Sequence, residues 1–218
     1  MSELLTAAAA AAPLAGGWTV YSLRMRRRLQ AAARDPLSGL LRREGFEGAA
    51  VRLLAGGDCS VLFIDLDGFK TVNDRFGHAT GNAIIRDTGA RLEVWAAGQH
   101  GAAGRLGGDE FAAVIPGSRH GNGLVFHLTL LHEVITAPVD HDGTTLTVGA
   151  SIGAAWSADH PGADFSGLLR AADEAMYAAK AAGGGWRLAP PCAPPCESVN
   201  GRRAGRPGAH REAAGGGS

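Results

Sequence analysis

Two short acidic clusters stand where this sequence could hold a metal ion and a nucleotide. One follows a glycine pair, as Gly107-Gly108-Asp109-Glu110, and the other, Asp65-Leu66-Asp67, ends an apolar run. Carboxylates are ligands that hard cations such as Mg²⁺ or Mn²⁺ prefer, and backbone without side chains lets a triphosphate lie close. Together the two clusters predict a metal–nucleotide site.

Apolar patterns around the clusters predict the elements that would position them. Residues 59–65 are apolar on both faces, as in a central strand with Asp65 at its end. Short strands at 102–106 and 110–115 flank the glycine pair as a hairpin, so that Asp109 stands at the entrance of the second strand. If the central strand neighbours this hairpin, the two aspartates meet at one edge of the sheet.

Such a pair of carboxylates would bind one or two metal ions that also take phosphate oxygens. The metal would lower the pKa of a sugar hydroxyl and neutralise charge on the phosphoryl group under attack. Lys70 and Lys180 could neutralise the outer phosphates. Each piece also has a plainer interpretation. The glycine pair is compatible with an ordinary hairpin, and Asp109-Glu110 with a solvated strand start.

Strand and helix patterns alternate along the rest of the chain, with the hairpin in the middle, so the sheet should be antiparallel or mixed. The predicted plan is a ferredoxin-like α+β fold, a central, mostly antiparallel sheet flanked by helices. Besides the strands above, the expected elements are a short helix carrying Phe46, a helical turn at 68–76, helices at 82–95, 122–135 and 165–182, a strand at 144–156 kinked by Gly149 and Gly153, and an edge strand at 186–188.

Length and composition limit the possible classes of protein. The 218 residues have room for one full domain with short extensions, and the net charge of zero argues against a nucleic-acid partner. Three scattered cysteines are too few for a disulfide framework. Residues 189–218 are rich in Pro, Gly, Ala and Arg without apolar periodicity, so we expect a disordered tail. The compact domain is then expected at 34–188.

Residues 1–33 differ in kind from the rest. Leu4 to Leu23 carries no charge, and as a helix these 20 residues would span about 30 Å, one hydrocarbon core. Arginines follow at 24–28, which would leave the rest of the chain in the cytoplasm. We therefore expect a single membrane helix with a basic linker, and a protein of the inner (cytoplasmic) membrane. The stretch is mostly alanine, so a soluble cytoplasmic protein with a soluble or interfacial helix is the alternative.

Five motifs, taken in order, resemble the GGDEF-domain diguanylate cyclase family. The match runs from Asp35 to Lys180 with the expected spacing. The motifs are the opening Asp35-Pro36-Leu37-Ser38-Gly39-Leu40, the segment from Asp65 to Gly81, the signature from Arg105 to Phe111, Ser151-Ile152-Gly153, and the late helical segment from Ala172 to Lys180.

The resemblance implies a GGDEF domain at 34–188 with the palm fold of nucleotidyl cyclases. It implies a homodimer that condenses two GTP into cyclic di-GMP, each 3′-hydroxyl attacking the α-phosphate of the partner's GTP. Asp65, the backbone carbonyl of Leu66 and Asp109 would bind the metals, with Asp109 and Glu110 catalytic. The implied substrate contacts are Gly68, Phe69, Lys70, Asn73, His78, Asn82, Gly107, Gly108 and Lys180. For His78, a scaffold histidine is an equal alternative.

The sequence departs from the family's pattern at three places. Asn82 stands where the family usually has an aspartate, and Gly184 where it has an arginine that contacts phosphate. Gly98 and Gly101 occupy the positions of the Arg-x-x-Asp pair that binds inhibitory product. Two alternatives to an ordinary cyclase therefore stay open. One is a cyclase with relaxed base preference, and the other is an inactive GTP-binding or scaffolding module.

Overall fold

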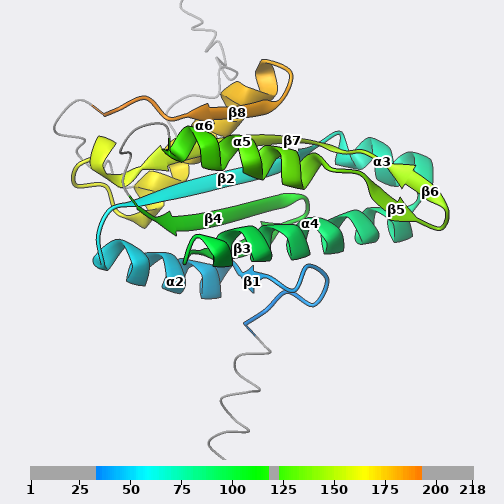
Figure 1. Cartoon of the computed structure of the whole chain (residues 1–218), viewed down its shortest axis with the longest axis horizontal. Helices are drawn as coiled ribbons and strands as arrows, with labels where there is room; N and C mark the ends of the chain where they lie inside the picture. Colours follow the sequence, from blue (N-terminus) through cyan, green and yellow to red (C-terminus); the bar gives the residue numbers. More distant parts are fainter. Residues whose placement is uncertain (1–32, 118–122, 193–218) are drawn as a thin grey trace, which may run out of the picture.

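The computed structural model describes residues 33–117 and 123–192. Within these residues a six-stranded sheet in the order β1-β3-β4-β2-β7-β8 has helices packed on both faces (Figure 1). The strands of the sheet are β1 (Leu41–Arg42), β2 (Cys59–Asp67), β3 (Ala102–Gly107), β4 (Glu110–Pro116), β7 (Gly149–Trp156) and β8 (Gly185–Leu188). The helices are α2 (Arg43–Ala55), α3 (Phe69–Phe76), α4 (His78–Gly98), α5 (Gly123–Thr136) and α6 (Phe165–Ala181), with a 3-10 turn at Ser157–Asp159.

The sheet is mixed, with an antiparallel centre. β2 lies in the middle and pairs antiparallel with both β4 and β7, and β3 pairs antiparallel with β4. The two outer pairings, β1 with β3 and β7 with β8, are parallel. The predicted α+β fold with helices flanking a mostly antiparallel sheet is confirmed.

Alternation along β2 divides the core into two layers. Leu62, Ile64 and Leu66 are buried in the layer that α4 and α5 cover. Val61 and Phe63 are buried in the layer beneath α2 and α6. Because successive strand residues point to opposite faces, the side chain at position 65 belongs to the α2/α6 face. The predicted strand, apolar on both faces, is confirmed.

Helix α6 packs unusually close to β7 because Gly153 has no side chain. A Cβ at this position would lie 1.9 Å from the carbonyl oxygen of Ala172 and 2.2 Å from the amide nitrogen of Met176. Both atoms belong to the α6 backbone, which cannot move away without moving the helix. Gly153 therefore sets the depth of α6, and with it the position of every residue that the helix carries.

The predicted continuous strand at 144–156 is wrong. Residues Thr144–Leu146 form β6, which pairs with β5 (Val139–His141) in a separate hairpin beside the main sheet (Figure 1). Asp142 and Gly143 connect these strands with φ of 48° and 74°. Two successive positive φ angles are typical of a type I′ turn, in which Asp-Gly is a favoured pair. The chain enters the main sheet only at Gly149.

Helix α4 begins four residues before the predicted start at Asn82. Gly77, with φ of 84°, precedes its first residue, His78. Gly81 is therefore inside the helix, where its amide donates to the carbonyl oxygen of Gly77 at 3.3 Å. The sequence pattern missed this first turn because it contains no apolar periodicity.

The described chain continues past Leu188. The amide of Ala189, a buried residue, donates to Ala154, and the amide of Cys192 donates to Asp159. The remainder of the predicted tail lies outside the described residues, as does the predicted membrane segment at 4–23. Among the residues that are described, no helix combines the length and apolar character needed to cross a bilayer.

Candidate active site

The acidic clusters meet at one end of the β2–β4 pair. Asp65 is the register partner of Glu110, so their side chains lie on the same face of the sheet. Asp109 lies in the adjoining turn, where its carbonyl oxygen accepts a hydrogen bond from the amide of Leu66 at 3.3 Å. The strands are neighbours, as the predicted meeting of carboxylates requires, with one correction, since β2 continues beyond Asp65 to Asp67. β4 begins at Glu110, in agreement with the strand expected at 110–115.

Glycine backbone geometry makes the turn between β3 and β4 possible. Gly107 pairs with Glu110, so Gly108 and Asp109 form a two-residue connection. Gly107 has φ of 155° and Gly108 has φ of 53°, and the register shifts between Arg105 and Gly107. A side chain at Gly108 would be strained in this left-handed conformation, so the glycine fixes the direction in which the next residue leaves the turn.

Arg105 supports this turn from the side, a role that the sequence analysis missed. Its Nε and Nη2 donate to the carbonyl oxygen of Gly108 at 3.0 and 2.7 Å, and its Nη1 lies 2.9 Å from Oδ1 of Asp35. Asp35 also accepts bonds from the amide and hydroxyl of Ser38, both at 2.8 Å. Burial opposes the charge of Asp35, but the bonds from Ser38 and Arg105 together lower its pKa. The signal was available, because Arg105 and Asp35 both belong to recognised motifs.

One lysine faces the carboxylates from α6. Lys180 Nζ lies 2.5 Å from Oδ1 of Asp65. Burial raises the pKa of Asp65, Lys180 opposes this, and the charges of Asp109 and Asp67 raise it further. The bond to Asp65 raises the pKa of Lys180, and the same neighbouring aspartates add to this effect. A single ammonium group therefore faces a group of mutually repelling carboxylates.

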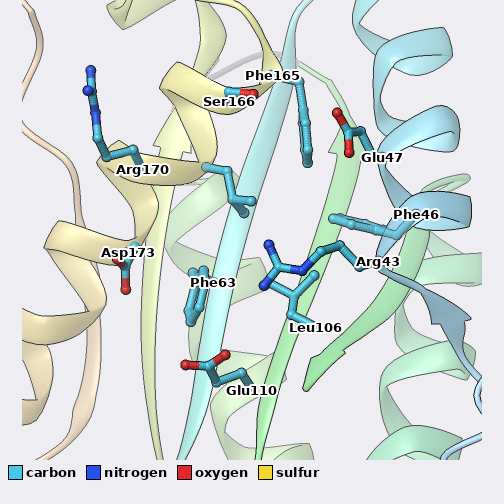
Figure 2. Close-up of a pocket in the computed structure, with 11 residues that line it drawn as sticks. Arg43, Phe46, Glu47, Phe63, Leu106, Glu110, Phe165, Ser166, Arg170 and Asp173 are labelled. Atoms are coloured by element: carbon cyan, nitrogen blue, oxygen red, sulfur yellow. The ribbon is translucent and has the colours of Figure 1, made fainter. Parts of the chain in front are cut away.

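Glu110 stands at the end of a groove between α2 and α6. The groove has a volume of about 410 Å³, and Figure 2 shows Arg43 reaching into it from α2 and Phe63 lying between Glu110 and the upper part of the groove. Burial is the main cause that raises the pKa of Glu110, and the charges of Asp65 and Asp109 add to it. Arg43 acts in the opposite direction. The half-buried carboxylate at the start of β4 thus has acidic neighbours on one side and Arg43 as a basic neighbour.

Backbone amides suited to phosphate follow β2 directly. Gly68, with φ of 66°, is the N-cap of α3. Because glycine has no side chain, the first amides of the helix receive no side-chain capping bond. The helix begins with Phe69 and the exposed Lys70. Uncapped amides at a helix N-terminus, together with the helix dipole, form a site that favours phosphate. The predicted phosphate-binding segment therefore lies beside the carboxylates of β2.

Three of the predicted substrate contacts, Asn73, His78 and Asn82, gather where α3 meets α4. Oδ1 of Asn73 would lie 2.0 Å from a Cβ at Gly81, so the asparagine packs directly on this glycine. The exposed Asn82 is the next residue of α4, and the exposed His78 precedes Asn82 by one helical turn. The structure brings these three side chains to one helix junction, next to the phosphate segment.

Gly184 lies where the family pattern has its arginine. Asp67 accepts a bond from the hydroxyl of Ser151 at 2.7 Å, and a Cβ at Gly184 would lie 3.0 Å from the other oxygen of Asp67. Gly184 has φ of 100°, between Gly183 at 98° and Gly185 at 89°. A larger residue at this position would be strained as well as crowded.

The donor set fits a hard divalent cation that arrives with phosphate ligands. Within residues 33–117 and 123–192, no three His, Cys, Asp or Glu side chains converge into a ready metal cage. Mg²⁺ rarely uses such cages, and it is usually held by one or two carboxylates, water and substrate phosphates. Asp65 and Asp109 supply that number of carboxylates beside the phosphate segment.

Comparison with known proteins decides the family. The family profile described as "Diguanylate cyclase, GGDEF domain" matches residues 32–185, well over half of the chain. This chain belongs to the GGDEF-domain diguanylate cyclase family. The match spans strands β1 to β7, the described helices and every residue of the candidate site, and it ends at the first residue of β8. The resemblance found in the sequence motifs is therefore confirmed.

Three similar proteins illustrate the match. An uncharacterized 19.3 kDa protein from the repSA 5′ region of Streptomyces ambofaciens is 43% identical over 75% of this chain and 87% of its own length. Diguanylate cyclase DgcN of Escherichia coli is 36% identical over 70% of this chain, but only 38% of DgcN is covered. The coiled coil and GGDEF domain of DgcB from Caulobacter crescentus, solved in complex with c-di-GMP, is 28% identical with a TM-score of 0.68, and the match covers 82% of this chain and 98% of that one.

Proposed function

We propose that this protein is a diguanylate cyclase that condenses two GTP molecules into cyclic di-GMP. The observation that carries the proposal is the register of β2 and β4, which pairs Asp65 with Glu110 and leaves Asp109 in the adjoining turn. The uncapped N-terminus of α3 follows β2 directly, so carboxylates and phosphate donors share one end of the strand. The name of DgcN and the ligand of DgcB support the same substrate class.

In the proposed reaction, the 3′-hydroxyl oxygen of one GTP attacks the α-phosphorus of the other, and pyrophosphate leaves. The hydroxyl proton passes to a nearby base, for which Glu110 is placed at the start of β4. A second attack in the opposite direction closes the ring and releases a second pyrophosphate. Because each protomer holds one GTP, the active form in this proposal is a homodimer in which the two sites face each other.

Each group of site residues has a separate task in this mechanism. Asp65, Asp109 and the carbonyl of Leu66 would hold Mg²⁺ or Mn²⁺, which when bound neutralises the phosphate and acidifies the attacking hydroxyl. The amides of residues 68–70 and Lys180 hold the phosphates and so orient the α-phosphorus for attack. Residues at the junction of α3 and α4 hold the base, and the glycines of the β3–β4 turn let the nucleotide approach the backbone.

A second candidate, an inactive GTP-binding or scaffolding module, is favoured by one observation. The position of the phosphate-binding arginine is a glycine with φ of 100°, and the space beside it is taken by Asp67. Asn82 favours a third candidate, a cyclase with relaxed base preference. The three candidates differ in their products. The first yields cyclic di-GMP, the second yields none, and the third incorporates adenine when ATP is supplied.

The test is to incubate the purified full-length protein with Mg²⁺ and GTP, ATP or both, and to identify the products by mass spectrometry. Asp65→Ala and Asp109→Ala should each lower turnover by about a hundredfold or more, because each removes charge stabilisation from the reacting phosphate. Glu133→Ala, which removes an exposed carboxylate from α5, is the matched control and should keep wild-type turnover.

Circular dichroism should show that all three variants fold like the wild type. Near wild-type turnover in either aspartate variant would refute the two-carboxylate site. GTP binding by the wild type without any cyclic product would discard the cyclase activity in favour of the scaffolding module.

A further inference from the structure

The contact between Lys180 and Asp65 bears on how the site is loaded. Lys180 belongs to the last turn of α6, and its ammonium group crosses to β2 to reach Oδ1 of Asp65 at 2.5 Å. The aspartate side chain is only 13% exposed, whereas the lysine side chain is 43% exposed. The more buried partner is thus held by the more exposed one, whose long side chain could turn into solvent without opening the core.

This ion pair occupies an atom that a metal ion needs. Mg²⁺ coordinates oxygen at about 2.0–2.1 Å, so an ion on Oδ1 of Asp65 would lie close to the ammonium group of Lys180 and would compete with it for the negative charge of the carboxylate. A free ion would also have to shed tightly held water and would leave Lys180 beside a dication with no partner. Both effects weaken the binding of metal alone.

An incoming triphosphate changes this balance. Its oxygens give Lys180 a new anionic partner, at the phosphate segment that begins with Gly68 just beyond the end of β2. The released carboxylate of Asp65 is then open to the metal, which the same phosphates also coordinate. The charges of Asp67 and Asp109 act on both members of the pair and raise the pKa of each. Once the lysine leaves, these neighbouring carboxylates repel one another without a positive charge between them, which favours the arrival of a cation.

We propose that Lys180 blocks metal binding in the free protein by holding Asp65, a contact that we call the lock. Asp65 becomes available to the metal only when a nucleotide phosphate draws the lysine away. Metal and nucleotide then enter as one unit, and each raises the affinity of the other by the same factor. The identity of the incoming phosphate rests on the proposed cyclase function, but the lock itself does not. Lys180 thereby gains a role in the free protein that is separate from its contact with substrate.

The position of α6 makes the lock specific to one lysine. The depth of α6 is set by its backbone contact with Gly153 of β7, so the distance from residue 180 to β2 is fixed by packing. Lys70, on α3, is the other lysine of the site, and it is exposed. Hydrogen bonds and ion pairs among the described residues join Asp65 to Lys180 and not to Lys70. The two lysines therefore provide a test and a matched control.

The experiment titrates Mn²⁺ into the full-length protein and follows free Mn²⁺ by electron paramagnetic resonance. It is done first without nucleotide and then with saturating α,β-methylene-GTP, which cannot be turned over. Lys180→Met should lower the Kd for Mn²⁺ alone by about tenfold, within the usual range of coupling between sites. The factor by which nucleotide increases the affinity for Mn²⁺ should be about tenfold smaller in Lys180→Met than in the wild type. Lys180→Arg keeps the charge and should keep the weak binding of the wild type.

Lys70→Met removes a neighbouring positive charge without breaking the pair. If general electrostatics were responsible, it would tighten Mn²⁺ binding as much as Lys180→Met does. Asp65→Asn combined with Lys180→Met should return Mn²⁺ binding to the weak level of the wild type. Thermal melting curves of each variant show whether it is folded, and Lys180→Gln provides a second neutral variant if the first melts early.

Unchanged or weaker binding of Mn²⁺ alone in folded Lys180→Met and Lys180→Gln would overturn the lock, as would an equal gain in Lys70→Met. These outcomes are distinct from failure of the proposed function. Tighter Mn²⁺ binding in Lys180→Met with no cyclic product from the wild type would remove the cyclase activity and leave the lock standing. Cyclic product from the wild type without tighter Mn²⁺ binding in Lys180→Met would support the cyclase activity and overturn the lock.

Discussion

Replacing Asn82 by aspartate should shift the nucleotide preference of this protein toward guanine. Asn82 is exposed and follows Gly81, the residue on which Asn73 packs, so it is placed beside the expected base site. A carboxylate there can accept hydrogen bonds from both N1–H and the N2 amino group of guanine. An asparagine offers one acceptor and one NH₂ group, which leaves one guanine donor without a partner and is complementary to adenine.

The size of the shift follows from the exposure of the site. A buried donor without a partner costs about 1–3 kcal/mol, and an exposed position belongs in the lower part of that range. At about 1–2 kcal/mol, the ratio of GTP to ATP affinity should rise by about five- to thirtyfold in Asn82→Asp. The new charge also repels every triphosphate, but this effect is common to both nucleotides and cancels in the ratio.

Isothermal titration calorimetry with the α,β-methylene analogues of GTP and ATP gives the ratio directly. Products from an equimolar GTP and ATP mixture should lose any adenine-containing species in the variant. The fold should tolerate the change, because an acidic residue near the N-terminus of α4 is favourable to the helix. An unchanged affinity ratio and product distribution would mean that Asn73 and local repacking already select guanine, and the reasoning about position 82 would be refuted.

Three further predictions concern the electrostatics, the packing and the regulation of the domain. Glu110→Gln should raise the melting temperature at pH 7.5, because burial and neighbouring charges disfavour the ionised carboxylate in the folded state. The pKa of Glu110 is raised above the ordinary 4.5, so the stability of the wild type falls as the pH rises from 4.5 through the pKa of the folded state. The gain in melting temperature of Glu110→Gln should therefore vanish below about pH 4, where both side chains are neutral. A lower melting temperature of the variant at pH 7.5 would contradict this. Gly153→Ala should lower the free energy of unfolding in urea by about 3 kcal/mol or more, because the new methyl group meets the backbone of α6. Gly98→Ala is the control, since its methyl group would enter open space and the free energy of unfolding should change little. Cyclic di-GMP should not inhibit through residues 98–101, because Gly98 and Gly101 supply neither the arginine nor the carboxylate that would bind it. Tight inhibition that is lost on mutating residues 98–101 would disprove this.

The sequence predicted the parts of the fold that depend on local pattern. The two apolar faces of β2 and the glycine turn before β4 are local signals, and they placed the acidic clusters at the ends of two strands. That these strands are neighbours was only a condition of the prediction, and the structure shows that they pair. The break between β6 and β7 was missed, since apolar alternation runs on through residues 144–148. The Asp142-Gly143 pair that marks the separate hairpin was visible but was not used.

Contacts across the site were less accessible from sequence. Lys180 and Asp65 are 115 positions apart, and their contact depends on how deeply α6 packs against β7. The sequence analysis assigned Lys180 to phosphate but had no means of placing it on a carboxylate in the free protein. Arg105 and Asp35 are 70 positions apart and were recognised only as members of separate motifs. Both pairs are set by tertiary packing, which no periodic pattern encodes.

The support that Asp35 and Arg105 give to the glycine turn also joins the beginning of the domain to its candidate active site. The amide of Arg42 donates to the carbonyl of Ala33, and Arg34 donates to Gly39, so the first described residues form a closed loop. From this loop, Asp35 reaches Arg105, which holds the carbonyl of Gly108.

Tension or twist applied to the chain ahead of residue 33 therefore reaches the turn that bears Asp109 through two side chains, in addition to the β1–β3 pairing. Because hydrogen bonds lower the pKa of Asp35, this linkage stays charged in mildly acidic conditions as well as at neutral pH. The first described residues thus have a short path of direct contacts to the edge of the sheet where Asp65 and Glu110 pair.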